Sequence, residues 1–183
     1  LNALCAHIPA HERVITVEDT AELQLQASHV VRLEARPPTA EGVAGISISE
    51  LLRTALRMRP DRFVVGEVRG GEVVDMLAAM NTGHHGSFAT CHANSADDAL
   101  LRLESLMLQH CGQWPREAIA QHICAAIDVV VSVGRHADGS RSVIEISEVS
   151  TTPGAPCRPL LRQDICSGVP SELRIGQLTR GRS

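Results

Sequence analysis

Acidic residues and a histidine follow three short apolar segments of the sequence. Glu18 and Asp19 come after the segment VITV. Glu67 and Arg69 come after FVV, and His92 comes after SFATC. An apolar strand that runs into an acid is typical of sites where a carboxylate holds Mg²⁺, directly or through water, beside nucleotide phosphates. A second acid pair can orient the attacking water, and a nearby histidine can report whether the γ-phosphate is present. These residues therefore predict the hydrolysis of a phosphate ester.

The elements that must position these residues alternate along the chain. Apolar runs at 14–17, 29–36, 63–65 and in SFATC indicate strands, and apolar stripes between them indicate helices. A capping box of Ser47 and Glu50 begins one helix, Ser95 caps another, and Pro115 opens a third. This alternation predicts an α/β fold with a mostly parallel sheet, followed by a hairpin made of IDVVVSV, ADGS and SVIEISEV. Any one polar residue could simply end a strand in solvent. Three groups at the carboxyl ends of parallel strands favour a ligand site.

The composition limits the classes of partner. Aromatic residues make up 2% of the 183 residues, too few for the stacking platforms that bind single-stranded nucleic acid. The net charge of −4 argues against a large surface that tracks phosphates. No window approaches 18 apolar residues, so we expect a cytoplasmic protein that reaches a membrane only through partners. Six cysteines without a CxxC pair predict reduced thiols and no zinc.

The same segments carry a family resemblance. VITVEDTAEL resembles the aspartate box, RPDRFVVGEVRGGE the Walker B segment and NTGHHGSFATCHANS the histidine box of the secretion ATPase superfamily. This superfamily comprises the hexameric motors of type II secretion, type IV pili and type IV secretion. ALRMRPDR, GEVRGGE, DMLAAMNTGH and TCHANS resemble most closely its CpaF-type branch, which drives the assembly of tight-adherence (Flp) pili.

The resemblance covers residues 1–150 and implies a RecA-like P-loop NTPase core with three layers, which binds ATP and Mg²⁺. It also implies a homo-hexamer that works with inner-membrane platform proteins in pilus assembly or protein export. By position, Glu18 would be the general base with Asp19 beside it. Glu67 would contact Mg²⁺ through water, and Arg69 occupies a nucleotide-binding position.

Two histidines also match the family's pattern. The resemblance makes His92 the phosphate-sensing histidine, with a catalytic role, and places His84 at a cofactor-binding position. With His85 they could suggest a metal site instead. No cysteine or acid lies at ligand spacing, however, so we expect no zinc.

The family's phosphate loop is absent from the sequence. No GxxxxGK[ST] stretch, whose backbone N–H groups and lysine would cradle phosphates, occurs in the 183 residues. In relatives this loop would precede a helix like LNALCAH, which here begins at Leu1. The sequence thus predicts a fragment that lacks the loop and its strand, with residues 1–150 a partial ATPase domain and 151–183 a tail of unknown role. The tail could form strands near 160–165 and 173–178. We expect the fragment alone to bind ATP weakly and not to hydrolyse it measurably.

Four arginines lie near the Walker B segment. Arg53 and Arg57 share one face of a predicted helix, and Arg59 and Arg62 follow it. In a ring they could reach the nucleotide of a neighbouring subunit, and a solvated helix face explains them equally well. Two other functions also remain open: a RecA-like ATPase directed at nucleic acid, and a nonenzymatic module that only joins the ring.

Overall fold

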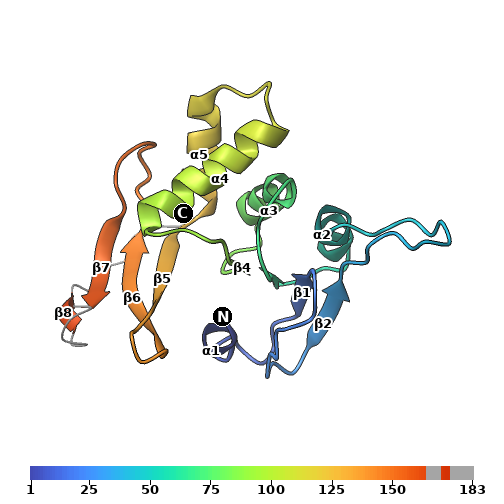
Figure 1. Ribbon diagram of the computed structural model, residues 1–183, viewed down its shortest axis with the longest axis horizontal. Coiled ribbons are helices and arrows are strands. Elements are labelled where there is room, and N and C mark those ends of the chain that lie inside the picture. Colours follow the sequence, from blue (N-terminus) through green and yellow to red (C-terminus); the bar gives the residue numbers. More distant parts are fainter. Residues whose placement is uncertain (164–169, 174–183) are drawn as a thin grey trace. The chain divides into compact units, whose positions relative to one another are not determined.

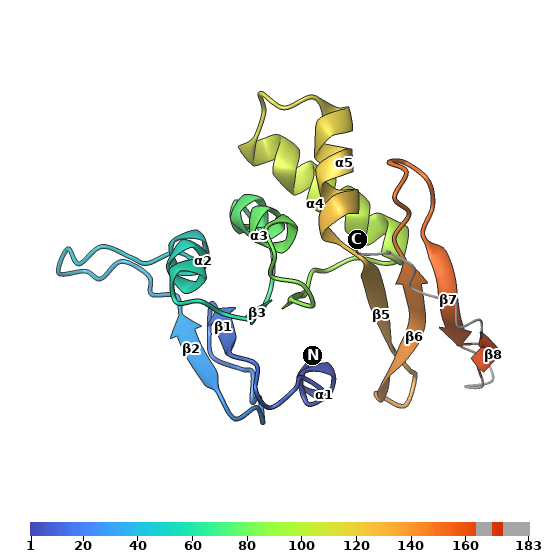
Figure 2. The same cartoon turned by 180° about the vertical axis from the view of Figure 1, so that it is seen from behind.

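The computed structural model describes residues 1–163 and 170–173, and the chain forms two compact units. The first unit comprises residues 1–91 and 106–113, and the second comprises residues 92–105 and those from 114 onward. Figures 1 and 2 show the chain from opposite sides. Within residues 1–163 and 170–173, no helix has both the length and the apolar character that crossing a membrane requires.

A parallel sheet forms the centre of the first unit. The elements of this unit are α1 (Asn2–Cys5), β1 (Val14–Glu18), β2 (Val30–Glu34), α2 (Ile48–Arg57), β3 (Arg62–Val65), α3 (Glu72–Asn81) and β4 (Phe88–Ala89). The strands lie in the order β2-β1-β3-β4, and each neighbouring pair is parallel. The predicted α/β fold with a parallel sheet is confirmed. The strand expected in SFATC is shorter than the segment, because only two of its residues pair with β3.

Helices cover both faces of this sheet, as Figures 1 and 2 show: α1 lies on one side and α2 and α3 on the other. On the α1 side, Val14 and Val64 pack with Cys5, Ile8 and Leu25 in a buried cluster. All five residues of β1 are buried. Such unbroken burial explains why this strand has no polar alternation in its sequence, as expected for a strand covered on both faces.

The expected capping box begins α2. The Ser47 hydroxyl accepts a hydrogen bond from the backbone N–H of Glu50, and the Glu50 carboxylate accepts one from the backbone N–H of Ser47. The hydrogen bonds from Ser47 lower the pKa of Glu50. The helix ends before Pro60, where the sequence predicted it to end.

The second unit contains an antiparallel sheet. Its elements are the first part of α4 (Ala96–His110, of which 106–110 belong to the first unit), α5 (Arg116–Ala126), β5 (Val129–Arg135), β6 (Arg141–Glu148), β7 (Arg158–Gln163) and β8 (Pro170–Leu173). The predicted hairpin is confirmed as β5 and β6, and β7 and β8 extend it into a sheet with the order β5-β6-β7-β8. The remaining parts of the two tail strands expected at 160–165 and 173–178 lie outside the described residues.

Candidate functional site at the carboxyl edge of the parallel sheet

Glu18 ends β1 at the edge where β3 also ends. The register pairs Val17 with Val65, so Glu18 lies beside Gly66 and close to the segment that carries Glu67. Parallel strands end at the same edge of a sheet, which is where ligands collect in α/β folds. The structure therefore brings the acids after β1 and β3 to one edge.

The Glu18 carboxylate is buried and is held by the backbone of the following loop. Only 3% of the residue is exposed. Its Oε2 accepts hydrogen bonds from the backbone N–H groups of Glu22 and Leu23, each at 2.9 Å. Gln24 donates its backbone N–H to Asn2 Oδ1 at 3.1 Å, which ties this loop to α1. Two donors on one oxygen fix the position of the carboxylate. Asp19, the next residue, is exposed.

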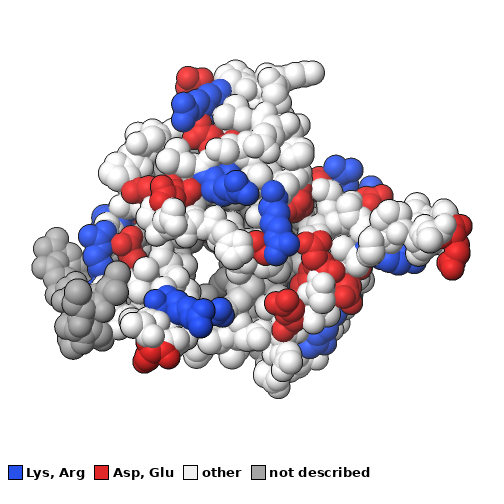
Figure 3. All heavy atoms as spheres, in the orientation of Figure 1, with Lys and Arg blue, Asp and Glu red and all other residues white. Residues whose placement is uncertain are grey.

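Glu67 forms an ion pair with Arg69 two residues later. The side chain of Glu67 is 19% exposed and that of Arg69 is 65% exposed. The pKa of Arg69 is raised chiefly by its hydrogen bond to Glu67, then by the charge of Glu67, with smaller contributions from Asp19 and Glu22. The guanidinium is therefore surrounded by acids, and Figure 3 shows acidic side chains gathered over the end of β1 with basic side chains beside them.

The turn that leads from β3 into α3 is also closed by an acid. The Glu72 carboxylate accepts hydrogen bonds from the backbone N–H groups of Arg69, at 2.5 Å, and Gly70, at 2.8 Å. Glu72 lies in the first turn of α3, where negative charge is favourable. It thus holds Arg69 and Gly70 in a turn beside Glu67.

Carboxylate oxygens are the ligands that Mg²⁺ prefers, and Mg²⁺ usually keeps several of its waters. Among residues 1–163 and 170–173, no cluster of three or more His, Cys, Asp or Glu side chains is placed to hold a metal ion directly. Contact through water from Glu67 fits this arrangement, since Mg²⁺ held by one or two carboxylates needs no all-protein cage. The chemistry available at this edge is proton acceptance by a fixed carboxylate beside an acid and an arginine.

The two predicted histidines belong to different units of the chain. His84 is half-buried; its Nδ1 lies 3.1 Å from the carbonyl oxygen of Ala79, and its ring lies 6.0 Å from that of Phe63. Phe63 lies near the start of β3, whereas Glu67 follows the end of that strand. His92 is exposed and belongs to the second unit.

Two of the four predicted arginines bind acids within the chain. Arg53 of α2 donates to the Asp75 carboxylate of α3 at 2.9 Å. Arg62 binds the Glu12 carboxylate through two of its nitrogens and donates to the carbonyl oxygen of Gly86. The hydrogen bond that Arg62 donates to the Glu12 carboxylate is the main cause of the lowered pKa of Glu12. Arg57 is exposed in the last turn of α2.

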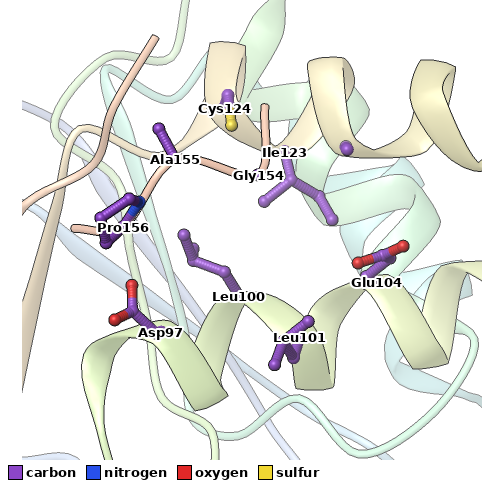
Figure 4. A pocket seen from close by; sticks show the side chains of 10 residues that line it. Asp97, Leu100, Leu101, Glu104, Ile123, Cys124, Gly154, Ala155 and Pro156 are labelled. Carbon is purple, nitrogen blue, oxygen red and sulfur yellow. The ribbon is translucent and has the colours of Figure 1, made fainter. Parts of the chain in front are cut away.

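The second unit has a cavity of about 310 Å³ between α4, α5 and the segment 154–156, shown in Figure 4. Cys124 and Asp97 line it. Asp97 also accepts the backbone N–H of Cys157 at 2.8 Å. Burial, with help from Asp97, raises the pKa of Cys157 to about 12. The five cysteines among the described residues are reduced thiols, as the sequence predicted, and Cys166 lies outside those residues.

Sequence reasoning did not find the residues that hold this edge together. Glu22 and Leu23 act through backbone N–H groups, which leave no mark in the side-chain types. Glu72 accepts hydrogen bonds from the backbone N–H groups of Arg69 and Gly70. Its position three residues after Arg69 was the available signal, because this spacing suits a side chain that reaches back to backbone N–H groups at a helix start.

Known proteins of secretion and conjugal transfer systems are similar to this chain. The type IV secretion system protein PtlH of Bordetella pertussis is 44% identical over 151 residues, which are 80% of this chain and 44% of PtlH. The conjugal transfer protein TrbB of Rhizobium radiobacter is 38% identical over 143 residues, which are 76% of this chain and 41% of TrbB.

A solved structure of a secretion ATPase is also similar to this chain. The crystal structure of the VirB11 ATPase from the Brucella suis type IV secretion system, in complex with sulphate, matches with a TM-score of 0.70 and 36% identity. The match covers 80% of this chain and 43% of that protein. The chain thus spans less than half the length of the relatives it matches. The sequence profile described as "Type II/IV secretion system protein" matches residues 1–152. The chain therefore belongs to the family of type II/IV secretion system proteins.

Proposed function

We propose that this chain supplies the catalytic acids of an ATP-hydrolysing secretion motor. The observation that carries the proposal is the buried Glu18 carboxylate, fixed by two backbone N–H groups beside the Glu67 and Arg69 ion pair. In this proposal Glu18 is the general base. Its Oε2 is held by the loop, so the other oxygen accepts the proton of the attacking water. Asp19 lies next to it in the chain and contributes negative charge at the same edge.

The nucleotide would be ATP with Mg²⁺, and Mg²⁺ when bound would neutralise charge on the phosphate oxygens. Glu67 contacts it through water. Arg69 has a 65% exposed side chain and can exchange its bond with Glu67 for a phosphate oxygen. His92 is proposed as the phosphate-sensing residue and His84 as a further cofactor-binding residue. Both assignments rest on the family's pattern.

The parent protein is proposed to be a homo-hexamer that couples hydrolysis to pilus assembly or protein export at inner-membrane platform proteins. Within the family we propose the CpaF-type branch, on the phrases GEVRGGE and TCHANS. Residues 1–150 would be the partial ATPase domain, with 151–183 as an extension. Arg57 is exposed and available to a neighbouring subunit, whereas Arg53 would first have to leave Asp75.

The chain alone is proposed to bind ATP weakly. Its 183 residues contain no lysine-bearing glycine loop, and so most of the donors that hold phosphates in the family are not part of this polypeptide. A titration with fluorescently labelled ATP checks this. Micromolar affinity for the isolated chain would contradict the proposal.

The function can be tested in a chimeric subunit. The part of a VirB11 protein that precedes its matched region, which in the family carries the phosphate loop, is joined to Leu1 of this chain. We expect the chimera to hydrolyse ATP, and Glu18→Gln to reduce kcat by roughly a hundredfold or more, as expected for loss of a general base. The matched control is Glu41→Gln, an exposed glutamate in the loop before α2. Equal turnover in the two variants would remove Glu18 from the mechanism.

A further inference from the structure

Gly66 lies directly against the side chain of Glu18. A Cβ added at Gly66 would be 3.1 Å from Glu18 Cγ and 3.5 Å from Glu18 Cβ. Nonbonded carbon atoms prefer about 3.5–4.0 Å. Gly66 is not one of the glycines with positive φ, so its backbone conformation does not require glycine. What this position requires is space for Glu18.

The backbone at Gly66 cannot retreat to make that space. Its N–H donates to the carbonyl oxygen of Val17 at 2.9 Å, which continues the pairing of β3 with β1. Its carbonyl oxygen accepts a hydrogen bond from the hydroxyl of Thr90 at 2.5 Å. Gly66 is therefore held on both sides, by β1 and by the segment after β4. A side chain at this position would displace Glu18 and not the strand.

Glu18 has little freedom to yield. Its carboxylate is almost fully buried, and its Oε2 is 2.9 Å from the backbone nitrogens of both Glu22 and Leu23. A displacement of a few tenths of an ångström at Cγ is transmitted to the carboxylate through one bond. These two hydrogen bonds therefore report directly on whether Gly66 leaves Glu18 in place.

We propose that Gly66 is a positioning residue for Glu18. The missing Cβ lets the carboxylate occupy the place in which the loop's N–H groups hold it and from which it faces the carboxyl edge of the sheet. The catalytic meaning of that position rests on the proposed function. The positional claim does not, because it concerns contacts that exist in the chain without nucleotide.

Hydrogen exchange of backbone amides in the full chain tests the positional claim. We expect Gly66→Ala to speed exchange at the amides of Glu22 and Leu23 by roughly tenfold, as expected when hydrogen bonds to a charged group weaken. The exchange rates of the Val64 and Val65 amides in β3 should rise much less, by no more than the loss of global stability accounts for. Gly112→Ala is the control, because a Cβ there would meet only one backbone oxygen, at 3.7 Å. Unchanged exchange at Glu22 and Leu23, or an equal loss of protection throughout the sheet, overturns the proposal.

A double-mutant comparison separates positioning from general packing. Gly66→Ala should lower the urea midpoint of the natural chain, and it should lower that of the Glu18→Ala variant by less than half as much, because the clashing Cγ is then gone. The positioning role would be refuted if Gly66→Ala lowered the urea midpoint equally in the natural chain and in the Glu18→Ala variant, or if neither protein folded. It would be supported if Gly66→Ala prevented folding of the natural chain but not of the Glu18→Ala variant. If these contacts respond as expected while Glu18→Gln leaves turnover of the chimera intact, the proposed function fails and the positioning role stands.

Discussion

Replacement of Thr16 by valine should make the protein more stable. Thr16 lies in the middle of β1 and is fully buried. Among the residues that the structure describes, its hydroxyl oxygen has no hydrogen-bond partner. The register places it opposite Val64, whose side chain belongs to the apolar cluster beneath α1. On the other side of β1 the register places Thr16 opposite Arg32, whose guanidinium donates to the carbonyl oxygen of Leu25. Within the part of the chain that the structure describes, the Thr16 hydroxyl is therefore enclosed without a partner.

The size of the effect follows from this environment. A buried hydroxyl without a partner costs about 1–3 kcal/mol. The methyl group that replaces it in valine gains about 0.8 kcal/mol from burial. Together these terms predict that Thr16→Val raises the free energy of unfolding by about 2–4 kcal/mol. With an m-value of about 2 kcal/mol/M, the urea midpoint should rise by about 1–2 M.

Urea denaturation of the chain, followed by circular dichroism, measures this difference. Thr90→Val serves as the opposite case, because the Thr90 hydroxyl donates to the carbonyl oxygen of Gly66. Loss of that bond should lower stability by about 1 kcal/mol. If Thr16→Val is neutral or destabilising, the Thr16 hydroxyl has a partner in solution and the reasoning from its burial is wrong.

Three further predictions concern single groups. Because the pKa of Cys157 is raised to about 12 from an ordinary 9.0, its stabilising contribution is complete below pH 9 and is lost as pH rises toward 12. Alkylation of Cys157 at pH 8 should be slow, and a rate equal to that of an unfolded peptide would contradict this. Ser47→Ala should lower the urea midpoint, with the difference from the natural chain shrinking below pH 4 as Glu50 is protonated, because the pKa of Glu50 is lowered in the fold. Arg69→Gln should raise the affinity for Mn²⁺ severalfold in paramagnetic titrations, because one positive charge leaves the acids beside it; unchanged affinity would mean that these acids do not meet the ion.

The strands and helices of the first unit could be predicted because their signals are local. The apolar run before Glu18 and the run before Glu67 each indicated a buried strand, and the rule for parallel sheets placed their ends together. The capping box of Ser47 and Glu50 was correct to the residue. These features depend on neighbours within a few positions, and the sequence contains all of that information.

The extent of the second sheet was harder to predict. The hairpin of β5 and β6 has a short turn and clear apolar content, whereas β7 contains two arginines and a proline among its six residues. Its position depends on pairing with β6, including the ion pairs of Arg158 with Glu148 and of Arg162 with Glu145. Such cross-strand pairs are visible only once the register is known, so the weak alternation of the sequence could not show that the strand extends the sheet.

The environment of Glu18 could not be predicted for a different reason. An acid at the end of an apolar strand predicts a charged group that faces solvent, yet this residue is 3% exposed. Its charge is satisfied by the N–H groups of Glu22 and Leu23, which any residue type except proline would supply. The one indication of this arrangement in the sequence is that residue 66 is a glycine, which has a hydrogen atom in place of a Cβ. A glycine after a strand usually suggests a turn, so its meaning as space for a carboxylate follows only from the distance between the two residues.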